Sequence, residues 1–198
     1  MLRASPESPR MFQSDFIDFF SRVPALVVPV IFVPIIVALF AWGVTGAGLG
    51  VLPALGAAVA GFVVWTFAEY WLHRTLFHWV PNTSWGPKMH FILHGVHHDW
   101  VNDKYRLVMP PAASLGLGVV FFALFYVLLG PVWVYPFFAG HVLGYLGYDM
   151  AHYYVHHFKP KSTVMKRLRA HHMNHHHNKD GRKFGVSTTL WDHVFRTY

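Results

Sequence analysis

The chain has 198 residues, enough for about one domain, and a formal net charge of +7. Hydrophobic residues make up 54% of it, aromatic residues 18% and charged residues only 13%, which disfavours a soluble domain and indicates an integral membrane protein. There is no cysteine, which excludes disulfides and thiolate ligands, so any metal must be held by nitrogen and oxygen.

Residues 1–22 precede the long apolar part of the chain. They contain no compact apolar stretch, so we expect no cleavable signal peptide here. Four aromatic residues stand at near-helical spacing in this segment: Phe12, Phe16, Phe19 and Phe20. This pattern predicts a short interfacial helix that leads into the first membrane span, and the alternative is a disordered tail with chance aromatics.

Two long runs, residues 23–68 and 107–148, lack any Asp, Glu, Lys or Arg. Each is roughly twice the ~20 residues that one helix needs to cross a bilayer, which disfavours an apolar soluble core. Turn-forming residues lie near the middle of each run: Gly46, Gly48, Gly50 and Pro53 in the first, Gly130 and Pro131 in the second. The pattern predicts four spans in two hairpins, at residues 23–45, 52–72, 112–129 and 132–150. Lipid cannot hydrogen-bond a bare backbone, so the fold should be all-α.

All sixteen Lys and Arg residues lie outside the two apolar runs, and neither hairpin tip carries one. The positive-inside rule therefore places both termini and the central segment in the cytoplasm. Residues 23–198 then form one membrane domain, whose cytosolic, metal-binding helical segments are residues 73–106 and 151–198. Topology and anionic lipid headgroups account for the net charge of +7 without a nucleic-acid partner.

Fifteen of the sixteen histidines lie in segments at or beyond the expected cytoplasmic face. Fourteen of these, all except His193, gather in four clusters: His73 and His78; His90, His94, His97 and His98; His152, His156 and His157; and His171, His172, His175, His176 and His177. Residues three or four apart share a helix face, so the last three clusters can each present several imidazoles to one point. His73 and His78 are five apart and share a site only if the helix ends or bends there.

A metal with an open position needs about three or four protein ligands, so eight to ten well-spaced histidines suggest two metals. Imidazole suits iron, zinc, copper and nickel. Any single cluster could be a surface accident, but four clusters on one side of one membrane are hard to explain in that way.

Other residues near the clusters receive weaker assignments. His90 and His157 are interpreted as further ligands or as hydrogen-bond partners of ligands. Asp149 and Glu69 could each accept a hydrogen bond from the N–H of a ligating ring and fix its tautomer, Asp149 for His152 and Glu69 for His73. The alternative for both carboxylates is an ordinary ion pair with Arg or Lys.

His141 is the one histidine inside an expected span. Ionisable groups within a span usually face a cavity or the bundle interior, so His141, Tyr145 and Tyr148 are expected to line the substrate channel. A packing histidine satisfied by a neighbour is the alternative. Three further histidines are expected to face solvent or headgroups or to have no role: His171, His177 and His193.

Several stretches together resemble a known family. They are "HRTLFH", "HGVHH", "RLVMPP", "GHVLGYLGYDMAHYYVHH" and "HHMNHHHNKDGRKFGVSTTLWDHVFRTY". Their joint order resembles the fatty acid hydroxylase superfamily, also labelled sterol desaturase-like, and looks closest to the fatty acid and sphingolipid 2-hydroxylase branch. The resemblance covers about residues 67–198.

The resemblance implies a membrane-embedded oxygenase with a dinuclear metal centre on the cytosolic face, which inserts oxygen from O2 into a C–H bond of a lipid chain. The implied ligands are His73, His78, His94, His97, His98, His152, His156, His172, His175 and His176. Two registers fit the last box, and His172 is chosen because its spacing matches H-x-x-H-H. Iron is the implied metal, although zinc can occupy such a site.

Unlike longer family members, this sequence has no fused cytochrome-type haem domain, so we expect a separate redox carrier as electron donor. We expect hydroxylation at C2 of a fatty acid or sphingolipid acyl group. Cationic residues such as Lys104, Arg106 and Lys183 could steer a carboxylate or headgroup to the centre. The rivals are an acyl desaturase, a sterol or carotenoid hydroxylase, and a metal transporter, which would need ligands along a path through the spans.

Overall fold

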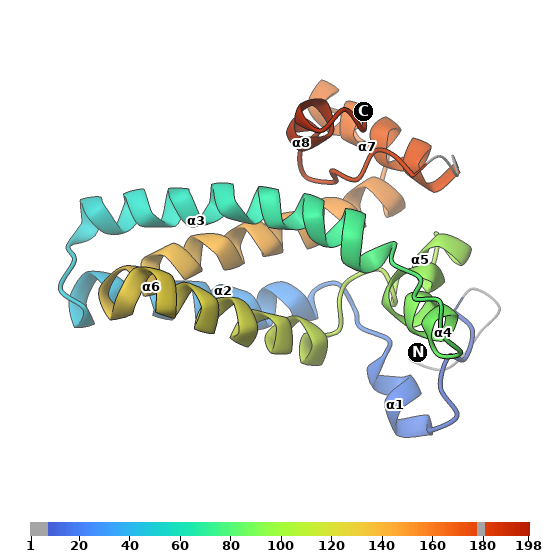
Figure 1. Ribbon diagram of the computed structural model, residues 1–198, viewed down its shortest axis with the longest axis horizontal. Coiled ribbons are helices and arrows are strands. Elements are labelled where there is room, and N and C mark those ends of the chain that lie inside the picture. The colour runs from blue at the N-terminus through green and yellow to red at the C-terminus, as the bar shows by residue number, and fades with distance from the viewer. Residues whose placement is uncertain (1–7, 178–180) are drawn as a thin grey trace. The chain divides into compact units, whose positions relative to one another are not determined.

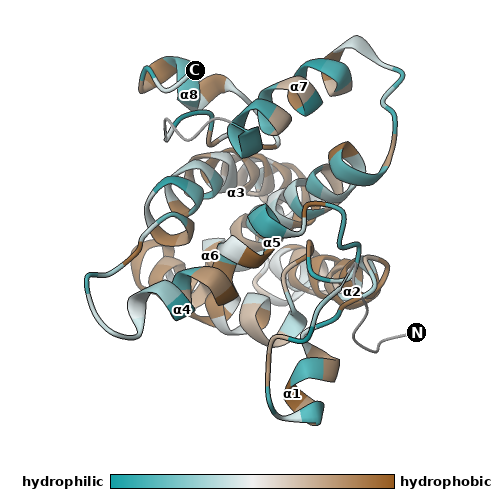
Figure 2. Cartoon of the chain, turned by 90° about the vertical axis from the view of Figure 1, so that its right-hand side faces the viewer, coloured by the Kyte–Doolittle hydropathy of each residue, from teal (hydrophilic) through white to brown (hydrophobic). Residues whose placement is uncertain are grey.

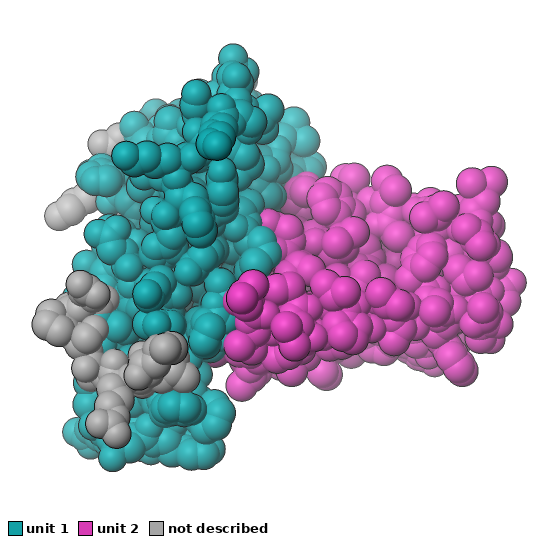
Figure 3. All heavy atoms as spheres, turned by 180° about the vertical axis from the view of Figure 1, so that it is seen from behind, with its two compact units in different colours: residues 1–25, 68–108, 148–198 teal, residues 26–67, 109–147 magenta. Residues whose placement is uncertain are grey.

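The computed structural model describes residues 8–177 and 181–198, and every regular element in that part of the chain is a helix (Figure 1). The all-α prediction is therefore confirmed for these residues. The chain divides into two compact units (Figure 3). The membrane unit comprises Leu26–Phe67 and Met109–Gly147. The histidine unit comprises Ala68–Val108, Tyr148–Tyr198 and the N-terminal residues up to Ala25.

The membrane unit is built from long apolar helices. They are α2 (Val27–Ala41), which continues into the π-helical segment η1 (Trp42–Gly46), most of α3 (Val51–Trp71) and most of α6 (Pro111–His157). Among the described residues, three helices are long and apolar enough to cross a membrane, at Val27–Gly46, Val51–Phe77 and Pro111–His157. Large apolar side chains such as Leu52 and Val127 are more than three-quarters exposed, and hydrophobic residues predominate along these helices (Figure 2). Contiguous exposed apolar surface of this kind is typical of a protein that contacts lipid.

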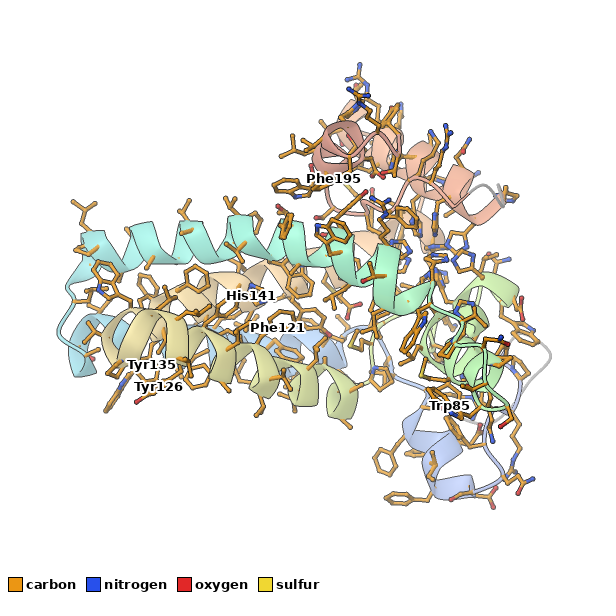
Figure 4. All side chains as sticks on the ribbon, viewed as in Figure 1. Trp85, Phe121, Tyr126, Tyr135, His141 and Phe195 are labelled. Atoms are coloured by element: carbon orange, nitrogen blue, oxygen red, sulfur yellow. The ribbon has the colours of Figure 1, made fainter. Side chains whose placement is uncertain are left out.

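The helix α6 is two arms joined by a break. Gly130 has φ 73° and ψ 174°, a conformation open to glycine because it lacks a Cβ. The rings of Phe125 and Phe137 lie 4.8 Å apart, and those of Phe121 and His141 lie 5.0 Å apart, so the arms run antiparallel (Figure 4). The expected break in the second apolar run is therefore present, and the expected third and fourth spans lie on its two sides.

Two glycines bring α3 and the second arm of α6 into backbone contact. A Cβ on Gly61 would lie 1.8 Å from the carbonyl oxygen of Phe137, and a Cβ on Gly140 would lie 1.8 Å from that of Ala58. Only glycine fits at such positions. Small residues at helix interfaces are the usual means by which helices pack closely in a membrane, where lipid is as apolar as the side chains.

The histidine unit consists of short helices and loops. Its elements are α1 (Asp15–Phe20), η2 (Leu72–Phe77), α4 (Gly86–His90), η3 (Phe91–Gly95), α5 (Val96–Asp99), α7 (Thr163–His177) and α8 (Leu190–Val194), with η2 and η3 π-helical. Polar residues predominate on α7 (Figure 2). Short helices leave many backbone groups without a helical partner, so side chains and loops must satisfy them.

A buried ionic cluster fixes α1. The carboxylate of Asp18 accepts hydrogen bonds from Arg22 at 2.5 Å, from Arg106 at 3.0 Å and from the backbone N–H of Met11 at 2.8 Å. Arg106 is buried, and Asp103 lies 3.7 Å from it on the other side. The expectation that Arg106 steers a substrate carboxylate is therefore wrong, because its charge is already paired inside the protein.

The short N-terminal helix was expected, and α1 forms within the segment. Its Phe16, Phe19 and Phe20 side chains are exposed, with Phe16 at 72%. The alternative of a tail without structure is wrong for the described part of this segment. Contact of α1 with a membrane interface stays a prediction.

Candidate metal centre

Ten imidazoles of the histidine unit converge in two groups. The first group is His73, His78, His94, His98 and His175; the second group is His97, His152, His156, His172 and His176. Within each group, one nitrogen of every ring lies within 4.8 Å of those of the other members. Metal–imidazole bonds of about 2.0–2.1 Å would place opposite ligand atoms about 4.2 Å apart, so each group has the dimensions of a metal site. These are the same ten residues that the family resemblance implied, and metal binding by them stays a prediction.

A widened helical turn brings His73 and His78 together. His73 lies in η2, and His78 follows the last residue of that segment. Hydrogen bonds in a π-helix join residues five apart, so residues at this spacing come closer to one face than in an α-helix. The two ring centroids lie 5.0 Å apart. The bend that the spacing required is therefore supplied by the π-helical turn.

The clusters seen in the sequence do not coincide with the two groups. On η3 and α5, His94 and His98 join the first group, whereas His97 joins the second. On α7, His172 and His176 join the second group, whereas His175 joins the first. The expectation that each of these clusters serves one point is wrong. Histidines four apart stay together, and the intervening ring points to the neighbouring group.

The two groups lie side by side. The rings of His98 and His176, which belong to different groups, have centroids 4.2 Å apart. His97 and His98 are adjacent in sequence, and their centroids lie 5.9 Å apart. Each of these two adjacent groups could hold a metal ion.

Burial keeps these rings neutral. Burial, and then the proximity of other imidazoles, lowers the pKa of His78 to about 3 and that of His98 to about 4. The same causes lower the pKa values of His94, His97 and His172 well below 6.5. Nε2 atoms approach to 2.8–3.1 Å in the closest pairs of each group. Neutral rings whose lone pairs converge are suited to a divalent cation, so the donor set fits iron or zinc.

A loop at residues 182–188 supplies hydrogen-bond partners that the sequence did not indicate. The carbonyl of Phe184 accepts from His73 Nδ1 at 2.5 Å, and the carbonyl of Arg182 accepts from His175 Nδ1 at 2.7 Å. A ligating imidazole usually donates its other N–H in this manner, which leaves Nε2 free for the metal. Every residue carries a carbonyl, so no residue type marks these positions in the sequence.

Glu69 holds this loop and does not contact His73. Its Oε1 accepts from the N–H groups of Val186 and Ser187, both at 2.8 Å, and its Oε2 accepts from the Ser187 hydroxyl. The expectation that Glu69 fixes the tautomer of His73 is therefore wrong. The carboxylate acts on the backbone of the loop that does so.

His171 is buried, so the expectation that it faces solvent is also wrong. Its Nε2 lies 3.0 Å from Asp192 Oδ2, and its ring stacks on Tyr198. Asp192 is fully buried. Burial raises the pKa of Asp192, but hydrogen bonds from His171, Gly185 and other groups outweigh this effect and lower it. His177 is exposed, as expected, and His193, for which no role was expected, is exposed too.

The weaker assignments stand apart from the two groups. His90 and His157 belong to neither, and one buried ring nitrogen of each has no hydrogen-bond partner among the described residues. Asp149 is buried and also lies outside both groups. The ring of Tyr148 lies 5.7 Å from that of His152. The expected roles of His90, His157 and Asp149, as metal ligands or as hydrogen-bond partners of metal ligands, stay predictions. The expected role of Tyr148 in a substrate channel also stays a prediction.

His141 and Tyr145 line an apolar pocket of the membrane unit. His141 is 2% exposed, and neither of its ring nitrogens has a hydrogen-bond partner among the described side chains and backbone groups. Phe121 and His141 point toward each other between the arms of α6 (Figure 4). A substrate channel lined by His141 and Tyr145 stays a prediction.

Comparison with known proteins agrees with this geometry. The family model for fatty acid hydroxylases matches residues 58–197. The chain belongs to the fatty acid hydroxylase family. This fatty acid hydroxylase is thus an oxygen-dependent hydroxylase enzyme of lipid metabolism, and its apolar helices make it a membrane protein.

Its relatives include dihydroceramide fatty acyl 2-hydroxylase FAH1 from Arabidopsis thaliana, 39% identical over 98% of this chain and 81% of the relative. Fatty acid 2-hydroxylase from Homo sapiens is 37% identical over 95% of this chain and 56% of the relative. A solved structure titled full length scs7p, in which only the hydroxylase domain is visible, matches with a TM-score of 0.89 and 37% identity. That match covers 99% of this chain and 73% of the other. The chain spans about half the length of the human relative.

Proposed function

We propose that this protein hydroxylates C2 of a fatty acyl chain, in a fatty acid or a sphingolipid, with one oxygen atom from O2. The observation that carries the proposal is the pair of adjacent five-histidine groups in a chain whose relatives are named as 2-hydroxylases. The balanced reaction converts C–H, O2, two electrons and two protons into C–OH and water. A separate redox carrier supplies the electrons.

The ten histidines are proposed as ligands of a dinuclear iron centre. Two redox-active irons would supply the oxidising chemistry, whereas zinc fits the same imidazoles but cannot change valence. The protein contributes neutral rings, converging Nε2 atoms and burial that limits access of water. His90, His157 and Asp149 are proposed as outer hydrogen-bond partners.

The membrane topology is part of the proposal. Gly130 divides α6 into two arms, which supports four spans in two hairpins within a domain of residues 23–198. The distribution of Lys and Arg supports a cytoplasmic location for both termini and the metal centre. Residues 1–22 would then lie at the interface, where the exposed phenylalanines of α1 contact headgroups and acyl chains.

The pocket around His141 is proposed to receive part of the lipid substrate. Its lining is almost entirely apolar and includes Phe32, Trp65, Phe121, Phe138, His141 and Tyr145. Such a pocket would bind the acyl chain of the substrate through apolar contacts. A polar group in the lining, here His141, would fix the position of that acyl chain through a hydrogen bond. Tyr148, beside His152, is proposed to contact substrate nearer the metal centre.

The test is mass spectrometry of acyl chains from a host whose own lipids lack 2-hydroxy groups. Cells that express the chain should contain acyl chains heavier by one oxygen, and fragmentation should place it at C2. His175→Ala should abolish this product, whereas His193→Ala, at an exposed position outside both groups, should retain it. Acyl chains lighter by two hydrogens would indicate a desaturase, and modified sterols or carotenoids a ring hydroxylase; either result would overturn the proposal.

A further inference from the structure

We infer that Asp192 and Glu69 are positioning residues for the first histidine group. Together they hold the carbonyl loop, residues 182–188, whose carbonyl groups orient two of the five rings. Neither carboxylate belongs to a histidine group itself. The inference rests on the proposed function, because it takes the ten histidines as metal ligands.

Four consecutive backbone N–H groups of the carbonyl loop bind the two carboxylates. Asp192 accepts from Phe184 at 2.9 Å and from Gly185 at 2.8 Å, with one oxygen for each. Glu69 accepts from the N–H groups of the next two residues, both at 2.8 Å. Hydrogen bonds to an ionised carboxylate, such as that of Asp192, are roughly twice as strong as neutral ones. The carboxylates of Asp192 and Glu69 thus hold the backbone of four consecutive loop residues in place.

The same stretch of backbone orients the rings. Phe184 donates its N–H to Asp192, and its carbonyl accepts from Nδ1 of His73. Two residues earlier, the carbonyl of Arg182 accepts from Nδ1 of His175. Because a carbonyl only accepts, both rings must carry the proton on Nδ1 and present an unprotonated Nε2 to the group. If the loop moved, His73 and His175 would therefore lose the hydrogen bonds that fix their orientation and their tautomer.

Two further side chains hold the carboxylate of Asp192. His171 contacts one oxygen at 3.0 Å, and the Thr197 hydroxyl donates to the other at 2.8 Å. Tyr70 in turn lies 2.9 Å from the Thr197 hydroxyl. The close approach of the loop to Asp192 also requires glycine at position 185. A Cβ there would lie 2.0 Å from the Thr188 carbonyl oxygen and 2.8 Å from Asp192 Oδ2. The support thus extends from the C-terminal residues to α3.

The two hydrogen bonds that the carbonyl loop makes to histidine rings both go to the first group. The Nδ1 atoms of His172 and His176 are buried and have no hydrogen-bond partner within the described ranges 8–177 and 181–198. Loss of the carboxylates should therefore act on one metal position and not on both. This selectivity separates a positioning role from a general structural one, which would weaken both positions together.

The experiment measures metal retention by the purified full-length protein loaded with zinc and titrated with a chelator. Metal content is read by mass spectrometry, and variants His78→Ala and His156→Ala identify which equivalent belongs to the first and second group. For Asp192→Asn, we expect one of two equivalents to dissociate at about 10- to 100-fold lower chelator concentration, as is typical when the outer partner of a ligand is removed. That equivalent should be the one absent from His78→Ala.

Asp15→Asn is the matched control, because Asp15 is exposed and, within residues 8–177 and 181–198, its one ion pair is with Arg10. It should retain both equivalents as the wild type does. If Asp192→Asn does not fold, Thr197→Val keeps the carboxylate, removes one of its hydrogen bonds together with the contact to Tyr70, and should give a smaller shift of the same equivalent. Equal weakening of both equivalents, or no shift in either variant, would overturn the inference. Wild-type protein that binds two metals but forms no hydroxylated lipid would refute the proposed function alone.

Discussion

Alanine at Gly61 or Gly140 should destabilise the membrane unit. A Cβ at either position would lie 1.8 Å from a carbonyl oxygen of the facing helix, against 3.4 Å for ordinary contact, so the helices would have to separate by about 1.6 Å. Overpacking typically costs about 1–3 kcal/mol. We expect about 3 kcal/mol at each position, because the obstacle is backbone and cannot rotate away. The double variant should cost less than the sum, since one separation relieves both clashes.

Thermal unfolding in detergent micelles, followed by tryptophan fluorescence, measures the effect. A loss of about 3 kcal/mol should lower the unfolding temperature by about 6–12 °C in a chain of this size. Gly56→Ala in α3 and Gly147→Ala in α6 are matched controls, because a Cβ at either meets nothing within 4 Å. Both should keep or raise the unfolding temperature, since alanine favours a helix. Wild-type stability of Gly140→Ala, or an equal loss in the controls, would refute the reasoning.

Two further predictions concern the histidines. Lowering the pH from 7 towards 4 should lower the unfolding temperature of the metal-free protein. Histidines of the unfolded chain bind protons below about pH 6.5, whereas His78 and His98 in the folded state do so only near pH 3 and 4, so the unfolded state gains protons first. An unfolding temperature that stays constant over this range would contradict the assignment of these rings as neutral. Separately, His141→Leu should reduce 2-hydroxylated product about three- to tenfold, the effect of one lost hydrogen bond, with metal content unchanged; wild-type product levels would show that His141 only packs.

Composition and residue order were sufficient to predict that the chain is a membrane protein and that its apolar runs form helices. Two charge-free runs can be accommodated in lipid only as helices, because every backbone group there must be satisfied internally. The break at Gly130 was readable because glycine, followed by a proline, is where a helix in such a run ends most easily. Helical spacing also indicated histidine clusters, because it limits which rings can share a face, and the family resemblance implied which ten of the histidines converge.

The division of those histidines into two groups was decided by the tertiary structure. Spacing shows that His94, His97 and His98 lie near one another, but the rotation of their helix determines which ring meets which group. A π-helical turn, which has no clear sequence signature, moved His73 and His78 onto one site. Neither effect can be derived from an ideal helix of 3.6 residues per turn.

The tertiary structure also decided the roles of the charged residues. Arg106 was expected to meet substrate and instead pairs with Asp18, 88 positions earlier in the chain. Glu69 was expected to contact a ring and instead binds backbone more than a hundred positions later. The sequence by itself determined which donor atoms were available and on which side of the apolar runs they lie. The pairing of those atoms depended on contacts between distant segments. Backbone N–H and carbonyl groups are the same at almost every residue, so only the folded chain decides which of them meet a carboxylate or a histidine ring.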